Sequence, residues 1–202
     1  MKHKAIETPY KGYRFRSRLE ARWAVFFDVI GVEWEYEEEG YVLPDGTCYL
    51  PDFKLKCWGK RGCIEDKPFD LYVEVKGEMT EEDMKKIISF SGLPSYDGDE
   101  EAYCKASNDM VPVLIVGNIP LIKGESNLYD SDIFDCYGTD GFFNYETIDG
   151  DYFGAYPSVL DGKFFLMGDD CNYHIGDYDK LIEGYQAARS ARFEHGEHGG
   201  AK

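Results

Sequence analysis

Residues 71–77 read LYVEVKG, and residues 51–55 read PDFKL. Both stretches have the aliphatic and aromatic content of β-strands. Glu74 and Lys76 are two positions apart, so on a strand their side chains leave the same face. If Asp52 lies on the neighbouring strand, two carboxylates and an ammonium share one small site. These stretches therefore predict a polar site on an otherwise apolar sheet.

The residue types at this site suit a metal ion and a phosphate. Mg²⁺ prefers carboxylates, water and substrate phosphate, so Asp52 and Glu74 are its expected ligands, with Mn²⁺ as a substitute. A metal held this way activates water and neutralises charge on a phosphodiester. Lys76, kept charged by Asp52 and Glu74, would stabilise the phosphate or orient the water. Glu20, carried by a helix, would bind the metal or hold one of its waters.

The flanking sequence predicts an α/β chain. Apolar residues recur at helical steps over 16–30, with Ser17 as N-cap and Gly31 as the stop. Alternation predicts a strand over 32–36, and residues 48–55 are expected to be extended after a turn at 44–47. Residues 57–70 are rich in charge, Gly and Pro and are interpreted as a loop.

The second half of the chain is less regular. A capping box at Thr80 and Asp83 opens a helix that runs to about Phe90. Residues 111–116 are typical of a central strand. Residues 124–176 are interpreted as irregular strands and loops, and 178–193 as a final helix with Leu181, Ile182, Tyr185 and Ala188 on one side.

The order of three motifs resembles the PD-(D/E)xK nuclease superfamily. A helix glutamate comes first, Pro51-Asp52 second, and Glu74-Val75-Lys76 third, with 21 residues between Asp52 and Glu74. The stretches FRSRLEARWA at 15–24 and AARSARFEHG at 187–196 look like a phage-encoded branch of it. The resemblance covers roughly residues 10–118 and the last helix. It implies a restriction-endonuclease-like mixed β-sheet core flanked by helices, similar to phage Holliday-junction-type endonucleases. It further implies a Mg²⁺-dependent DNA endonuclease, with branched DNA as the substrate to test before plain duplex.

Length and charge bound these expectations. With 202 residues the chain fits one domain, 1–202, in which an acidic, aromatic-rich insertion of about 97–176 precedes the C-terminal helix. The net charge of −17 is uneven, because residues 1–80 carry 13 Lys and Arg against 15 Asp and Glu, while 81–202 carry 9 against 24. Six arginines are candidates for DNA phosphate contacts: Arg14, Arg16, Arg18, Arg22, Arg189 and Arg192.

The candidate site and DNA-contact residues also have interpretations without a function. The arginines could lie on solvated helices, Glu20 could pair with Arg16 or Arg22 in solvent, and Glu74 with Lys76 could be an ordinary strand face. Homodimerisation is plausible, since cutting both strands in one encounter needs two sites.

A second class of function uses the same fold. In it the chain is a phage interaction protein whose acidic surface, through residues such as Asp149, Asp151 and Asp169, binds and blocks a host nucleic-acid-binding or defence protein. The bland alternative is an acidic surface that keeps the chain soluble.

Compartment and cysteine usage give the remaining expectations. The sequence has no apolar run of about 18 residues, so we expect no membrane span and a place in the cytoplasm. The six cysteines are expected to be free thiols there. A zinc site using Cys57 and Cys63 is the minor alternative.

Overall fold

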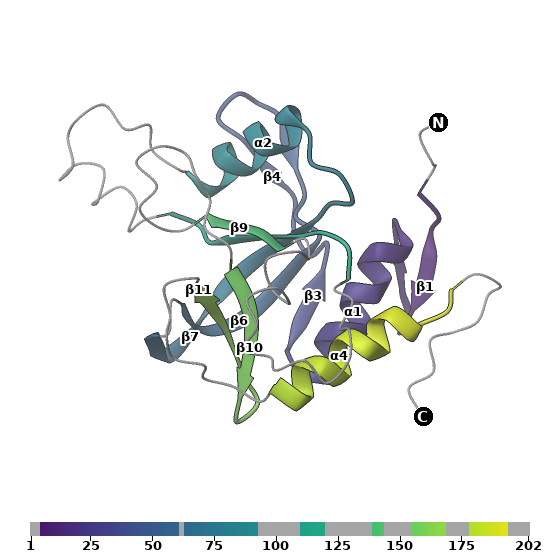
Figure 1. Cartoon of the computed structure of the whole chain (residues 1–202). Coiled ribbons are helices and arrows are strands. Elements are labelled where there is room, and N and C mark those ends of the chain that lie inside the picture. Colours follow the sequence, from purple (N-terminus) through teal and green to yellow (C-terminus); the bar gives the residue numbers. More distant parts are fainter. Residues whose placement is uncertain are drawn as a thin grey trace.

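The structure, a computed structural model, describes residues 5–60, 63–92, 110–119, 139–143, 155–168 and 178–193. Over these ranges the chain has a mixed α/β fold with three helices and a seven-stranded mixed sheet (Figure 1). The helices are α1 (Arg18–Ile30), α2 (Glu81–Ser91) and α4 (Tyr178–Ser190). The strands are β1 (Thr8–Tyr10), β2 (Tyr13–Phe15), β3 (Trp34–Tyr36), β4 (Tyr41–Val42), β5 (Cys48–Tyr49), β6 (Phe53–Lys60), β7 (Cys63–Val75), β8 (Val113–Val116), β9 (Thr139–Phe143), β10 (Ala155–Leu160) and β11 (Lys163–Gly168).

The large sheet is built around the β6–β7 hairpin. Its order is β10-β11-β6-β7-β8-β9, and β3 pairs with β6 beside this path. Strand β7 is antiparallel to β6 and parallel to β8, so the sheet is mixed. Strands β1–β2 and β4–β5 form two small antiparallel sheets of their own. Strand β8 lies between β7 and β9, which agrees with the predicted central strand.

Two sequence-based expectations about this hairpin are wrong. Residues 57–70 are not a loop, because β6 continues to Lys60 and β7 begins at Cys63. Asp70 of β7 pairs with Lys56 of β6 across the strands, and the register of the two strands shifts between Cys57 and Gly59. Residues 48–55 are also not one strand. Strand β5 ends at Tyr49 and β6 begins at Phe53, which leaves Asp52 just before β6.

The two faces of the sheet carry separate cores. Leu71, Val73 and Leu114 belong to the cluster that includes α1 and α4. Tyr72 and Ile115 belong to the cluster that includes α2. Figure 1 shows α2 on one side of the sheet and α1 with α4 on the other. Because side chains alternate along β7, residues 74 and 76 project toward α2.

Local signals place the helices close to where the sequence predicts them. Helix α1 begins at Arg18 rather than Arg16 because Ser17 is its N-cap and accepts a hydrogen bond from the Glu20 amide. Its C-cap, Gly31, has φ of 78°, a left-handed conformation that glycine adopts without strain. The predicted capping box of Thr80 and Asp83 opens α2.

Helix α4 packs against α1 at a glycine. A Cβ at Gly184 would lie 2.8 Å from Ile30 Cγ2 and 2.9 Å from Phe26 Cδ2, so only glycine permits this approach. The predicted apolar side of α4 is buried at Leu181, Tyr185 and Ala188, with Ile182 half-buried. The helix ends at Ser190, three residues before the predicted end. The helix pair fixes α1, which carries Glu20, against the sheet.

The segment interpreted as an acidic insertion, about 97–176, supplies strands β8 to β11 to the sheet. The candidate partner-binding residues Asp149, Asp151 and Asp169 lie outside the described residues.

No helix among the described residues is long and apolar enough to cross a membrane.

Candidate active site

The pairing of β6 with β7 brings Asp52 beside Glu74. Phe53 pairs with Val73 in antiparallel register, and the Asp52 amide donates to the Val73 carbonyl at 3.1 Å. The Asp52 Oδ2 atom accepts a hydrogen bond from the Val75 amide at 2.7 Å. Asp52 is 2% exposed and Glu74 is 4% exposed. Two carboxylates therefore lie buried where β6 begins and β7 ends.

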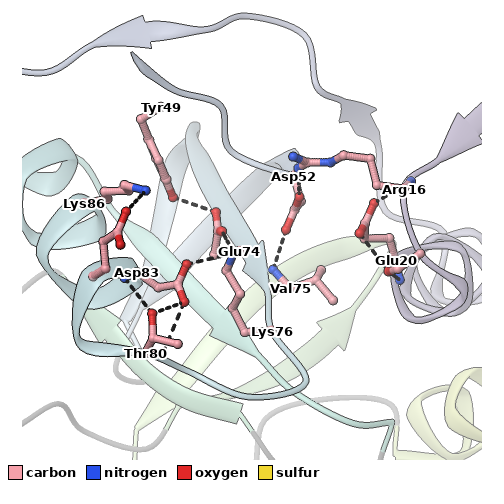
Figure 2. A network of polar contacts seen from close by, with 12 residues as sticks. Arg16, Glu20, Tyr49, Asp52, Glu74, Val75, Lys76, Thr80, Asp83 and Lys86 are labelled. Carbon is pink, nitrogen blue, oxygen red and sulfur yellow. Dashed lines mark hydrogen bonds and ion pairs between the residues drawn. The ribbon is translucent and has the colours of Figure 1, made fainter. Parts of the chain in front are cut away.

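Glu74 is held by a phenol and an ammonium (Figure 2). Tyr49 donates its hydroxyl to Glu74 Oε2 at 2.7 Å, and Lys76 Nζ lies 3.0 Å from Glu74 Oε1. Burial, followed by the charge and hydrogen bond of Glu74, raises the pKa of Tyr49, so this phenol stays protonated as a donor. Tyr49 was not among the candidates, since no sequence signal places it opposite residue 74.

Lys76 contacts a second carboxylate, and it is not the one that the sequence suggested. Its Nζ lies 3.2 Å from Asp83 Oδ1 on α2, where Asp52 had been the expected partner. Burial by itself lowers the pKa of Lys76, but Glu74 and Asp83 outweigh it and raise the pKa overall. Lys76 is therefore a cation at neutral pH.

Asp83 links this cation to the start of α2. Its Oδ2 accepts hydrogen bonds from the amide of Thr80 at 3.2 Å and from the Thr80 hydroxyl at 2.5 Å. Burial raises the pKa of Asp83, but the bonds from Thr80 and Lys76 lower it overall. The capping-box pattern identified Asp83 as a helix cap. It gave no sign of the contact with Lys76, which depends on how α2 packs on the sheet.

Glu20 is a buried carboxylate with protein donors at both oxygens. It is 6% exposed, and its Oε2 accepts from the Tyr36 hydroxyl at 2.6 Å and from the Arg16 amide at 3.0 Å. Its Oε1 accepts from the Ser17 hydroxyl at 2.7 Å. This arrangement differs from the plain interpretation, in which Glu20 is a solvated partner of an arginine side chain. Tyr36, like Tyr49, was missed by sequence reasoning.

The Arg16 side chain lies at the carboxylates rather than on an open basic surface. Its Nη2 contacts Asp52 Oδ1 (Figure 2). Its Nε lies 2.6 Å from Glu37 Oε1. Through its amide and guanidinium, Arg16 bridges Glu20 and Asp52. Its side chain is 54% exposed, whereas that of Asp52 is 3% exposed.

The other candidate arginines lie away from this contact. Arg14 pairs with Glu7 at 3.2 Å, and both side chains are largely exposed. Arg189 Nη1 donates to the Ile119 carbonyl at 2.8 Å, so it joins α4 to the segment after β8. Arg18 and Arg22 lie in the first half of α1, and both are half-buried. Arg192, after α4, is exposed. Their contact with DNA stays a prediction.

Negative charge exceeds what the cations of the site neutralise. Burial, then repulsion by Glu74 and Glu20, raises the pKa of Asp52 from 3.8 to about 7. The Val75 amide and Arg16 oppose this rise but do not cancel it. Forcing buried carboxylates together costs folding free energy, and such groups are typical of functional sites. The cluster would therefore be stabilised by an added cation.

We expect Asp52→Asn to stabilise the metal-free protein at pH 8. A carboxyl whose pKa is about 7 when folded and near 3.8 when unfolded binds its proton more tightly in the folded state. Wild-type stability contributed by Asp52 is therefore present below about pH 4 and lost as the pH rises through 7. Thermal unfolding in chelator should show a higher midpoint for Asp52→Asn at pH 8, by about 2–4 °C for each kcal/mol relieved. The difference between the midpoints of Asp52→Asn and wild type should shrink toward pH 5. A difference that grows as the pH falls would contradict the prediction.

The donor chemistry of the site fits Mg²⁺ through a pair of carboxylates. Among the described residues, no three His, Cys, Asp or Glu side chains group closely enough to hold a metal ion. Mg²⁺ is commonly bound by one or two carboxylates together with water and substrate phosphate, so Asp52 and Glu74 suffice.

The two cysteines of the alternative zinc site are described only in part. Cys57 is buried and its thiol donates to the Gly59 carbonyl at 3.4 Å, while the Cys63 side chain lies outside the described residues.

The comparison of this chain with protein-family models found no match, and neither did the comparison with curated proteins.

Proposed function

We propose that this protein is a Mg²⁺-dependent deoxyribonuclease of the PD-(D/E)xK type with a restriction-endonuclease-like core. The observation that carries the proposal is the buried pair of Asp52, just before β6, and Glu74, on β7, with Lys76 in contact with Glu74. Residues of these types, gathered in one place, are what metal-assisted phosphodiester hydrolysis needs.

The free-energy cost of burying these two carboxylates supports a functional role for them over the alternative of an ordinary exposed strand face. Glu74 and Asp52 are each less than 5% exposed, and burying carboxylate charge costs free energy even where each group has a cationic partner, as these two have in Lys76 and Arg16. A strand face serving only solubility would leave such side chains in water. The raised pKa of Asp52 points to a site that is completed by a cation.

The chemistry assigns a role to each side chain. Asp52 and Glu74 would hold Mg²⁺, which supplies an activated water and neutralises phosphate charge. A water oxygen would form a bond to phosphorus as the bond from phosphorus to one sugar oxygen breaks, with one proton leaving the water and one proton reaching the sugar oxygen, which departs as a hydroxyl. Lys76 donates a hydrogen bond to a non-bridging phosphate oxygen or to the attacking water. Glu20, whose carboxylate accepts a hydrogen bond from Tyr36, would hold a water beside these two ligands.

The substrate follows from the resemblance and from the basic residues. The half-buried and exposed arginines near the start of α1, together with those at the end of α4, would contact DNA phosphates and supply most of the affinity. Branched DNA, such as a four-way junction, is the preferred substrate class in this proposal. A homodimer would present two sites and cut both strands in one encounter.

Cleavage of a labelled DNA panel tests this function. A four-way junction, a flap, a single strand and a plain duplex are incubated with wild type in Mg²⁺, Mn²⁺ or chelator. We expect metal-dependent cutting that is fastest on the junction or flap and absent in chelator. A Lys76→Met preparation purified in parallel controls for contaminating nucleases. Failure of wild type to cut any of these DNAs with either metal would overturn the proposal.

A further inference from the structure

We propose that Arg16 exchanges between Asp52 and a DNA phosphate, so that binding of Mg²⁺ and binding of DNA strengthen one another. This inference depends on the proposed function and assigns regulation to the same site. It starts from one contact, in which the guanidinium of Arg16 occupies Asp52 Oδ1. The other oxygen of Asp52 accepts from the Val75 amide at 2.7 Å.

Arg16 competes with a metal for the same carboxylate. The Asp52 side chain is buried, with 3% of its surface exposed, whereas the Arg16 side chain is 54% exposed. Arg16 therefore lies between Asp52 and solvent. A divalent cation next to a guanidinium is repelled, and burial strengthens that repulsion because water screens it less. Mg²⁺ therefore binds Asp52 favourably only when the guanidinium has moved away.

The arginine is placed to move toward DNA. Its backbone is fixed by the hydrogen bonds of its amide, at 3.0 Å to Glu20 and 3.1 Å to the Tyr36 hydroxyl. Its guanidinium, in contrast, is half-exposed and is shared between Asp52 and Glu37. The planar fork of arginine suits phosphate as well as carboxylate. A phosphate near the site therefore offers Arg16 an alternative partner and leaves Asp52 to the metal.

This exchange makes the two binding events reciprocal. If a DNA phosphate draws Arg16 from Asp52, the affinity for Mg²⁺ rises, and Mg²⁺ must raise the affinity for DNA by the same factor. Without DNA, Arg16 keeps the carboxylate occupied. The site would then load its metal chiefly when substrate is present.

Calorimetric titration with Mg²⁺ tests the exchange without relying on activity. All proteins carry Lys76→Met so that cutting is slowed, the junction is checked for cleavage after each run, and each protein is titrated alone and with a saturating four-way junction. With Arg16 present, the junction should tighten Mg²⁺ binding about tenfold, within the usual range of coupling between sites. Arg16→Gln should bind Mg²⁺ about tenfold more tightly without DNA and gain little from adding it. Arg16→Lys, which keeps the charge, should fall between the two.

The control is Lys11→Gln, which removes one positive charge from a side chain of similar exposure, 57%, paired with Asp28 instead. It should leave Mg²⁺ affinity unchanged, and thermal unfolding checks that every variant is folded. Equal Mg²⁺ affinity with and without Arg16 would overturn the exchange alone. No Mg²⁺ binding by any variant, together with no cleavage by wild type, would overturn the proposed function and the exchange with it.

Discussion

A Lys76→Met variant is expected to cut DNA about 10²–10³-fold more slowly than wild type, the usual cost of removing one donor that stabilises transition-state charge. Lys76 Nζ lies 3.0 Å from Glu74 and 3.2 Å from Asp83, and this pair aims the ammonium at the carboxylate site. Methionine keeps the apolar stem and removes the charge. Single-turnover cleavage at saturating Mg²⁺ measures the effect, which should fall on the rate of the cutting step.

The matched control for this variant is Lys56→Met. Lys56 also forms a lysine–carboxylate pair on the sheet, with Asp70, but both side chains are exposed, at 46% and 43%. Its loss should change the cleavage rate less than twofold, since exposed pairs contribute little. Similar losses in both variants, or a Lys76→Met variant within threefold of wild type, would contradict the assignment. Thermal unfolding of both variants separates lost chemistry from lost structure.

Elements governed by local chemistry were predictable from the sequence. Ser17 and Gly31 delimit α1, and Thr80 with Asp83 opens α2, because each of these signals satisfies backbone groups within a few residues. The shared face of Glu74 and Lys76 was also predictable, because strand alternation alone dictates it, and the two side chains are in contact.

Contacts between distant segments could not be predicted in the same way. Tyr36 and Tyr49 each donate to a buried carboxylate, but their partners lie 16 and 25 residues away and depend on tertiary packing. The extension of β6 to Lys60 and of β7 back to Cys63 was missed because a charged, Gly- and Pro-containing composition is typical of loops. Strands tolerate charged residues that pair with opposite charges on the neighbouring strand, as Asp70 does with Lys56.

Arg16 illustrates a further limit. Its sequence neighbourhood is basic, which indicates a surface for phosphate, yet its guanidinium contacts Asp52, 36 residues away. Charge counting along a chain gives the sign of a local region but not its partners. The contact joins Arg16, just before the N-cap Ser17 of α1, to Asp52, just before β6.

Trp23→Ala is expected to destabilise the fold by about 3–5 kcal/mol, the usual cost of truncating a buried aromatic side chain. Trp23 is fully buried on α1 and packs edge-on against Phe26 and Tyr185, with ring centroids 5.2 and 6.4 Å away. Its Nε1 also donates to the Gly117 carbonyl at 2.8 Å. The substitution leaves a cavity and an unpaired carbonyl at the junction of α1, α4 and the segment after β8.

Such a loss approaches the whole stability of a typical domain, about 5–15 kcal/mol. Urea unfolding measures it, and Tyr13→Ala is the control, because that aromatic side chain is 41% exposed and should cost far less. A loss below about 1 kcal/mol in Trp23→Ala would contradict the packing described for α1. Although α1 also carries Glu20, the folded fraction of Trp23→Ala at low temperature should retain near-normal cleavage per folded molecule, because the substitution leaves every proposed site residue in place. Catalysis in this account depends on the site residues, and Trp23 acts on it only through the population of folded protein.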